Sequence, residues 1–287
     1  NILLGQHPDL MGAGELFRLP AAWAAEEFCS CGEPLTRCPV WREIVHRWRR
    51  STDDEPVSTY GRLQTSFEGW LPRGRAGDSS AWRAYAEQTV SLFQAIRDVT
   101  GRDVIVDSSK LPARARALAR MPGIDLRILH LVRDGRGVAW SLRRRLARDP
   151  RAGIQTEKQA RSVLRTGIVW MATNLATEHV ARRLPVGQAL RLGYEELVGD
   201  TDAVLARIGT TVEVDLARVA EALAARAPLE VGHVMAGNRL RMDSAVLLRP
   251  DLEWQQRLPI PQRRLLEGVC RPLLRRYGYL PAVTGLP

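Results

Sequence analysis

Three short runs of apolar and β-branched residues, separated by stretches of helical character, most constrain how this chain can fold. They lie at residues 103–107 (DVIVD), 126–132 (LRILHLV) and 188–194 (QALRLGY). Each run has the length and composition of a buried strand, and the sequences between them, such as 111–120 and 157–182, predict helices. This alternation predicts an α/β fold in which a parallel sheet carries helices on both faces.

The rest of the sequence fits a single domain over residues 1–287. That length is enough to bury one large core, and no run of about 18 apolar residues predicts a membrane span. Residues 10–15 predict a further short strand, and residues 33–101 have a mostly helical pattern. Within them, residues 53–78 are rich in Gly, Pro, Ser and acidic residues, which predicts a loop or a mobile lid.

The chain is strongly basic, with 42 Lys and Arg against 32 Asp and Glu and a net charge of +10. Such a charge suits nucleic acid or an acidic small molecule as the ligand. Because no basic patch is interleaved with aromatic residues, nucleic acid is the less favoured ligand. Lysine occurs only at Lys110 and Lys158, so a composition that otherwise uses Arg favours a specific role for Lys110, which follows the strand at 103–107.

Cys29, Cys31 and Cys38 lie close together in the sequence. Their CxC spacing differs from the CxxC pairs of many zinc sites, and His46 or His7 would be the nearest fourth ligand. A local disulfide is a second alternative, and free thiols in a tight turn are a third. We predict no bound metal. Because no secretory signal is visible, we predict a cytoplasmic protein.

The sequence LVRDGRGVAWS at residues 131–141 carries the strongest functional indication. The strand ends near Val132, so Arg133 lies at the carboxyl edge of the sheet, where ligands of parallel sheets bind. Two glycines permit a tight turn before a helix whose second turn contains Ser141. Because a helix N-terminus beside an arginine and a hydroxyl attracts anions, we predict an anion site at Arg133 and Ser141.

With three other segments, this motif resembles the 3′-phosphate motif of sulfotransferases that use 3′-phosphoadenosine 5′-phosphosulfate (PAPS), especially bacterial members. The resemblance implies a P-loop NTPase-like fold, PAPS as co-substrate and no metal, with Arg133 and Ser141 on the 3′-phosphate. The segment VDSSKLP resembles a family segment whose lysine lies beside the transferring sulfuryl group, which implies this position for Lys110. The segment RLGYEEL resembles one whose tyrosine contacts the adenine side, which implies this role for Tyr194. GNRLR resembles the loop that closes over the 3′-phosphate, which implies three further nucleotide-binding residues: Asn238, Arg239 and Arg241.

One element of that family's pattern has no counterpart in the sequence. The 5′-phosphosulfate loop, a GxxRSGT-like turn between the first strand and the first helix, is absent, and so is GxxxxGK[ST]. The resemblance therefore implies that this loop lies upstream of Asn1 and that the chain is N-terminally truncated.

The implied reaction moves a sulfuryl group from PAPS to a hydroxyl or amine of a small-molecule, carbohydrate, lipid or peptide acceptor. Its physics is similar to that of phosphoryl transfer, in which positioning and electrostatic stabilisation dominate. We predict Glu15 as the general base, with Asp107 and Ser108 as the alternative. We predict Lys110 as the cation near the transferring group.

Two other functions stay open at this stage. A P-loop kinase or NTPase fragment would share the parallel sheet and predicts Mg²⁺-dependent ATP turnover. A nucleic-acid-binding module would fit the net charge and predicts salt-dependent binding to generic DNA. The sequence predicts neither the acceptor nor the oligomeric state. It predicts that His130, inside an apolar strand, is a core histidine.

Overall fold

The computed structural model describes residues 1–69 and 79–281, which divide into two compact units. The first unit comprises Asn1–Leu126, Asp149–Thr156 and Arg218–Leu247, and the second comprises Arg127–Arg148, Glu157–Ala217 and the chain from Leu248 onward. The single-domain organisation stays a prediction. Among the helices of the described residues, none has the length and apolarity needed to cross a membrane.

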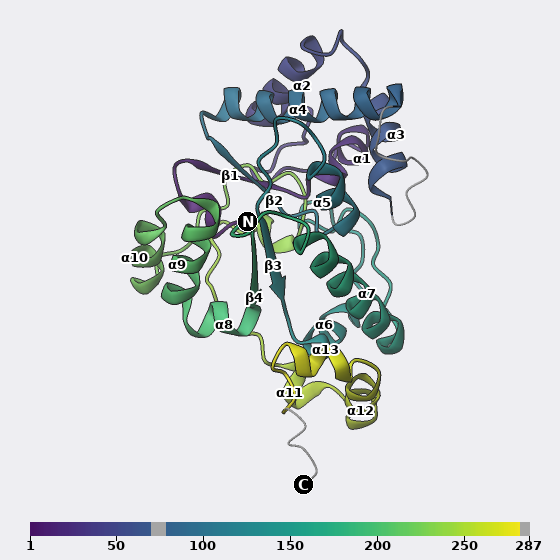
Figure 1. Ribbon diagram of the computed structural model, residues 1–287, viewed down its shortest axis with the longest axis vertical. Coiled ribbons are helices and arrows are strands. Elements are labelled where there is room, and N and C mark those ends of the chain that lie inside the picture. The colour runs from purple at the N-terminus through teal and green to yellow at the C-terminus, as the bar shows by residue number, and fades with distance from the viewer. Residues whose placement is uncertain (70–78, 282–287) are drawn as a thin grey trace. The chain divides into compact units, whose positions relative to one another are not determined.

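The first unit contains a two-stranded parallel sheet (Figure 1). Strand β1 (Leu10–Gly14) pairs with β2 (Val104–Asp107), and all five residues of β1 are buried. The strands predicted at 10–15 and 103–107 are therefore confirmed. The register shifts between Gly12 and Gly14, so the pairing is irregular at the point where Glu15 follows β1.

Helices make up most of the first unit, and local sequence explains several of their ends. Pro39 occupies the first turn of α2, and the Ser79 hydroxyl accepts the Trp82 N–H at the start of α4. Gly101 ends α4 in the left-handed conformation that favours glycine. The helices are α1 (Leu19–Ala24), α2 (Pro39–Arg50), α3 (Val57–Glu68), α4 (Ser80–Thr100), α5 (Pro112–Leu118) and α10 (Ala217–Ala224).

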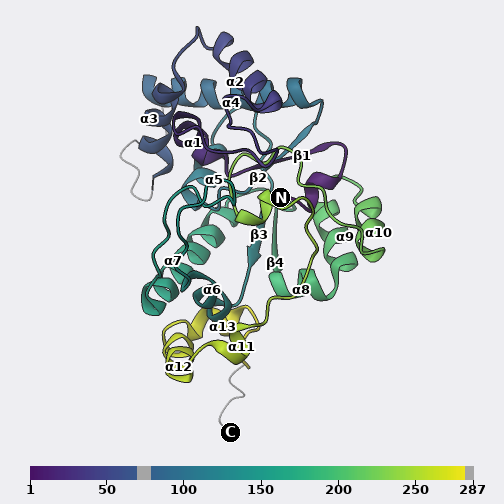
Figure 2. The same ribbon diagram turned by 180° about the vertical axis from the view of Figure 1, so that it is seen from behind.

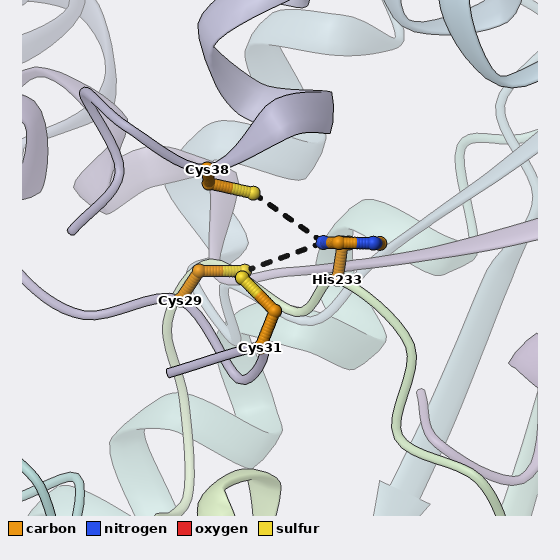
Figure 3. Close-up of side chains that lie close together, drawn as sticks. All are labelled: Cys29, Cys31, Cys38 and His233. Carbon is orange, nitrogen blue, oxygen red and sulfur yellow. Dashed lines mark hydrogen bonds between the residues drawn. The ribbon is translucent and has the colours of Figure 1, made fainter. Parts of the chain in front are cut away.

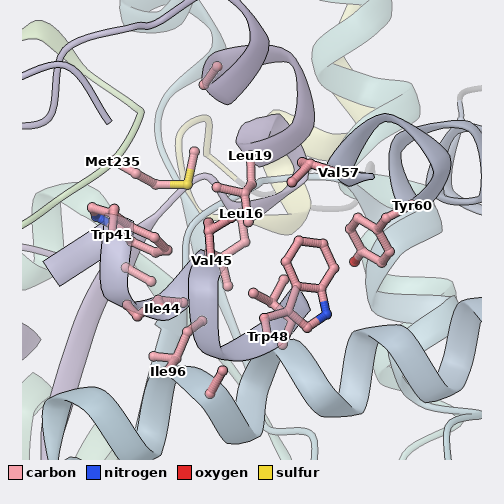
Figure 4. Close-up of a cluster of buried hydrophobic side chains, with 14 of the residues drawn as sticks. Leu16, Leu19, Trp41, Ile44, Val45, Trp48, Val57, Tyr60, Ile96 and Met235 are labelled. Atoms are coloured by element: carbon pink, nitrogen blue, oxygen red, sulfur yellow. The ribbon is translucent and has the colours of Figure 1, made fainter. Parts of the chain in front are cut away.

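The core of the first unit forms where α2 packs against α4, which lie side by side in both views (Figures 1 and 2). Apolar residues of α2 recur at helical spacing, so Trp41, Ile44, Val45 and Trp48 are all buried on one face (Figure 4). The indole N–H of Trp48 donates to the carbonyl of Gln88 at 2.9 Å. This packing fixes α2 and the loop that leads into it.

The loop or lid predicted for residues 53–78 is wrong for Val57–Glu68, which form α3. Aromatic packing decides this, because Tyr60 lies edge-on to Trp48 at 5.0 Å and Phe67 stacks on Tyr85 at 5.3 Å between ring centroids. The polar composition of residues 53–78 gave no indication that Tyr60 and Phe67 pack in the core. Residues 70–78 lie outside the described residues.

The second unit contains the other parallel pair, β3 (Ile128–Val132) with β4 (Ala189–Gly193), in register from Ile128–Ala189 to Val132–Gly193. The α/β prediction is confirmed, with two parallel pairs in the described residues where we expected one sheet. The helices of this unit are α6 (Gly135–Leu142), α7 (Val163–Ala181), α8 (Tyr194–Gly199), α9 (Thr201–Val212), α11 (Trp254–Arg257), α12 (Ile260–Val269) and α13 (Arg271–Arg276).

His130 is a core histidine, as predicted. It is buried in β3, and one of its ring nitrogens lies 2.8 Å from the side-chain oxygen of Asn174 on α7. Burial lowers the pKa of His130, so the ring stays neutral and serves the core of the second unit.

Candidate active site

At the carboxyl ends of β1 and β2, the first unit brings Glu15 and Lys110 together. The Lys110 ammonium lies 2.6 Å from Oε1 of Glu15. The Lys110 side chain is 68% exposed and that of Glu15 is 18% exposed, so this pair lies at the surface. Lys110 also has φ +60°, a left-handed conformation that non-glycine residues seldom adopt outside constrained sites.

Residues 234–237 hold the backbone of Glu15 in place. The Glu15 N–H donates to the carbonyl of Ala236 at 3.1 Å, and the Met235 N–H donates to Ala13 at 3.2 Å. Gly14 has φ +92°, and a Cβ there would lie 2.5 Å from the Ala236 oxygen. Glycine is therefore required before Glu15, because a side chain would push the two segments apart.

Asp107, the alternative base, has its carboxylate fully engaged. Its Oδ1 accepts from the Leu16 N–H at 3.2 Å and from the N–H and hydroxyl of Ser109 at 2.9 and 2.5 Å. Its Oδ2 accepts from Nε of Arg114 at 2.6 Å. With these donors the Asp107 carboxylate organises the loop after β2. Glu15 is therefore the better candidate for a base.

Behind Asp107 lies a buried ionic network. The Arg114 guanidinium, whose side chain is 2% exposed, also binds the carboxylate of Glu68, which is 0% exposed, at 2.7 Å. The Tyr85 hydroxyl donates to the same carboxylate. Burial raises the pKa of Glu68, while the Arg114 charge opposes that rise. The network ties α3 and α5 to the carboxyl end of β2.

The second unit places Arg133 directly after β3, as predicted, and brings Tyr194 to it. The guanidinium lies over the Tyr194 ring at 4.9 Å from its centroid, and the Tyr194 hydroxyl donates to the Arg249 carbonyl at 3.0 Å. One terminal nitrogen of Arg133 lies 2.8 Å from the carboxylate and 2.9 Å from the carbonyl of Asp251. Asp251 therefore partly neutralises the Arg133 charge.

Two buried N–H donors that have no hydrogen-bond partner among the described residues lie beside the start of α6. They are Nε of Arg133 and Nε1 of Trp254. A Cβ added to Gly137 would lie 3.2 Å from each of these nitrogens. Ser141 follows Gly137 by four residues in α6, so it lies on the same helix face one turn further on, and it is exposed. Unpaired buried donors at a helix N-terminus suit an anion.

A side chain at Gly137, beside Nε of Arg133 and Nε1 of Trp254, should weaken anion binding. In the Gly137→Ala variant the new methyl lies 3.0 Å from Cδ1 of Trp254, so we expect about tenfold weaker binding of adenosine 3′,5′-bisphosphate in calorimetry. Gly268→Ala on α12 is the matched control, because nothing lies within 4 Å of its Cβ position. Equal affinities of the two variants would contradict an anion site at Gly137.

The three C-terminal candidates differ in their surroundings. Asn238 is exposed, and its side chain accepts the Leu240 N–H at the start of a short 3₁₀ turn, while Arg239 is exposed. Arg241 is buried, and its guanidinium donates to the Phe28 carbonyl at 2.9 Å. In this structure Arg241 therefore holds the loop around Phe28, and we leave it out of the proposed site.

A cavity of about 1030 Å³ in the second unit has Trp254 among its lining residues. Its charged lining groups pair with one another, as Arg136 does with Asp134 at 2.7 Å and with Glu267 at 2.6 Å. Neither Arg133 nor Ser141 is among the residues that line it. We therefore do not assign the anion to this cavity.

Sequence reasoning missed Asp251 and Trp254. Asp251 follows Arg133 by 118 residues, and neither Asp251 nor Trp254 belongs to a recognisable sequence motif. Only the folded structure shows that Nε1 of Trp254 and Nε of Arg133 both lie beside Gly137.

Comparison with known proteins assigns the chain to a family. The model of the sulfotransferase family matches residues 1–218. Among solved structures, the chain is similar to the sulfotransferase domain from the curacin biosynthetic pathway, at 14% identity and a TM-score of 0.46, over 95% of this chain and 91% of that one. No curated protein matches the sequence. Since the family model covers 218 of the 287 residues, the chain belongs to the sulfotransferase family.

Proposed function

We propose that this protein transfers a sulfuryl group from PAPS to a hydroxyl or amine acceptor. Family membership supports sulfotransfer in general and disfavours the kinase or NTPase alternative. The observation that carries the choice of donor is the convergence of the unpaired Arg133 and Trp254 N–H groups over Gly137. This arrangement suits a phosphate, and the 3′-phosphate is the group that distinguishes PAPS from most adenine nucleotides.

In the second unit, Arg133, Trp254 and Ser141 bind the 3′-phosphate. The phosphate competes with Asp251 for the Arg133 guanidinium, so binding requires that this ion pair loosen. Tyr194 keeps the guanidinium in place by stacking, and its ring offers an aromatic surface to the nucleotide. Each charge-assisted hydrogen bond contributes about 1.5–3 kcal/mol.

In the first unit, Glu15 and Lys110 perform the transfer chemistry. Glu15 takes the proton of the acceptor as the new bond from acceptor oxygen or nitrogen to sulfur forms. The bond from sulfur to the donor's phosphate oxygen breaks, and adenosine 3′,5′-bisphosphate leaves. Lys110 stabilises the negative charge on the transferring group, and its ammonium lies 2.6 Å from the Glu15 carboxylate that takes the proton.

Small molecules, carbohydrates, lipids and peptides stay the proposed acceptor classes. The bacterial origin and the cytoplasmic location stay predictions.

Calorimetric titration with adenosine 3′,5′-bisphosphate tests the donor assignment. Arg133→Ala should weaken binding at least 10²-fold, because two charge-assisted hydrogen bonds, at least 3 kcal/mol together, are lost. Asp251→Asn should strengthen binding several-fold, since it removes the competing charge. Arg145→Ala, which deletes an exposed charge on the same basic stretch, is the control and should change little.

A second ligand separates phosphate recognition from general damage. Adenosine 5′-monophosphate lacks the 3′-phosphate, so Arg133→Ala should scarcely change its affinity. Equal losses for the two nucleotides would show that Arg133 does not bind the 3′-phosphate, and unchanged affinity for the bisphosphate would refute the proposed donor site.

A further inference from the structure

Three cysteines and one histidine of the first unit converge on one point, although they come from distant parts of the sequence (Figure 3). The ligand atoms of Cys29, Cys31, Cys38 and His233 all lie within 4.8 Å of one another. His233 follows Cys38 at a sequence separation of 195, so the sequence alone pointed to His46 or His7 as the fourth group. In the structure neither of those histidines belongs to the cluster.

The distances suit a single tetrahedral ion. The Cys38 sulfur lies 3.3 Å from Nδ1 of His233, and the Cys29 sulfur lies 3.9 Å from the same nitrogen. With Zn–S of about 2.3 Å and Zn–N of about 2.05 Å, tetrahedral geometry separates sulfur from nitrogen by about 3.6 Å and two sulfurs by about 3.8 Å. The observed distances bracket the first value, so binding an ion requires only small side-chain shifts.

Hydrogen bonds outside the cluster fix both the turn that carries Cys29 and Cys31 and the segment that carries His233. The Cys29 N–H donates to the Glu33 carbonyl at 2.8 Å and closes a tight turn in which Gly32 has φ +86°. The Ser30 hydroxyl donates to the Gly232 carbonyl at 2.6 Å and accepts the Val234 N–H at 2.7 Å. These bonds fix the turn against the segment that carries His233.

Further groups support the ligands themselves. The indole N–H of Trp41 donates to the His233 carbonyl at 2.8 Å, which fixes the backbone of the histidine. Each of the three sulfurs interacts with backbone N–H groups. The N–H of Cys31 interacts with the sulfur of Cys29, and the N–H of Glu33 interacts with the sulfur of Cys31. The sulfur of Cys38 interacts with the N–H groups of Val40 and Trp41. N–H groups around sulfur stabilise thiolates, the form that binds metals.

We propose that Cys29, Cys31, Cys38 and His233 bind one structural Zn²⁺ ion. Three thiolates and one imidazole nitrogen are the soft and borderline ligands that zinc selects, and four protein ligands leave no open coordination position for catalysis. All four cysteines of the chain are free thiols in the structure. A disulfide would use only two of the three clustered sulfurs and would leave His233 unexplained. This proposal replaces the sequence-based prediction of no metal.

The ion would stabilise the neighbourhood of Glu15. His233 is followed by Val234, Met235 and Ala236, and the last two are hydrogen-bonded to Ala13 and Glu15. A metal that ties His233 to the cysteine turn therefore holds this segment along the end of β1. Because ions that bind only the folded state stabilise it, zinc removal should lower the thermal stability of the protein.

Elemental analysis tests the proposal without reference to enzymatic activity. Protein purified under reducing conditions with zinc in the medium should contain about one zinc per chain. Cys31→Ser should retain less than a tenth of that metal. Cys31 is the exposed ligand, so its substitution disturbs packing least. Cys270→Ala is the control, because this cysteine lies in the second unit, and it should retain the metal.

Cobalt provides a second readout on the unaltered chain. After chelation, added Co²⁺ should give the intense visible bands of tetrahedral coordination together with thiolate-to-cobalt charge transfer, and zinc should then displace it and restore the melting temperature. Less than about a tenth of an equivalent of zinc together with absent cobalt–thiolate bands would overturn the proposal. Equal metal loss in the Cys31 and Cys270 variants would overturn it too, and so would a disulfide among the three clustered cysteines in freshly purified protein.

Discussion

Replacing Glu15 by Gln is expected to lower turnover with an aliphatic alcohol acceptor by about 10²–10⁴-fold, the usual contribution of a general base. The amide keeps the shape of the side chain, but it cannot take the acceptor's proton. It also breaks the 2.6 Å ion pair with Lys110. Release of adenosine 3′,5′-bisphosphate from PAPS measures the rate.

A comparison of two acceptors distinguishes the loss of a general base from a structural effect of the Glu15→Gln substitution. An acidic phenol that is already ionised at the assay pH needs no base, so Glu15→Gln should reduce its rate only a few-fold. A similar loss with both acceptors would mean that Glu15 positions other groups and is not the base. Glu55→Gln, an exposed carboxylate of the same unit, is the control and should leave both rates unchanged.

Sequence patterns were sufficient for the strands and for the residues beside them. A strand end in a parallel sheet is a local feature, so β1, β2, β3 and β4 could be located from apolar runs, and Glu15, Lys110 and Arg133 were found as the residues that follow three of them. Helix α3 could not be located in this way, because its aromatic anchors depend on contacts with α2 and α4.

Contacts between side chains that are far apart in the sequence could not be predicted from the sequence. Asp251 beside Arg133 and His233 beside Cys38 carry no local signal, since their partners lie 118 and 195 residues away. The choice between Glu15 and Asp107 also needed the structure. Glu15 directly follows β1 and Asp107 is the last residue of β2, but only the hydrogen bonds show that the Asp107 carboxylate is already occupied.

The largest loss of stability is expected for Arg114→Met. This substitution leaves the Glu68 carboxylate, which is 0% exposed, without its cation, and it removes one donor from Asp107. Removing one partner of a buried ion pair typically costs about 3–5 kcal/mol in the free energy of unfolding. Denaturant unfolding of the two proteins measures the difference. Arg116→Met, an exposed position on the same helix, should stay within about 0.5 kcal/mol of wild type.

The pH dependence of this loss identifies its cause. Burial raises the pKa of Glu68, and without Arg114 only the hydrogen bond from Tyr85 opposes that rise. A carboxyl whose pKa is higher in the folded than in the unfolded state destabilises the fold as pH rises through the folded value, and it ceases to do so below the unfolded value. The stability gap between Arg114→Met and wild type should therefore narrow on acidification, and adding Glu68→Gln should recover part of the loss at neutral pH. A gap below about 1 kcal/mol, or one that is constant with pH, would show that packing of the arginine side chain, and not its charge, stabilises this end of β2.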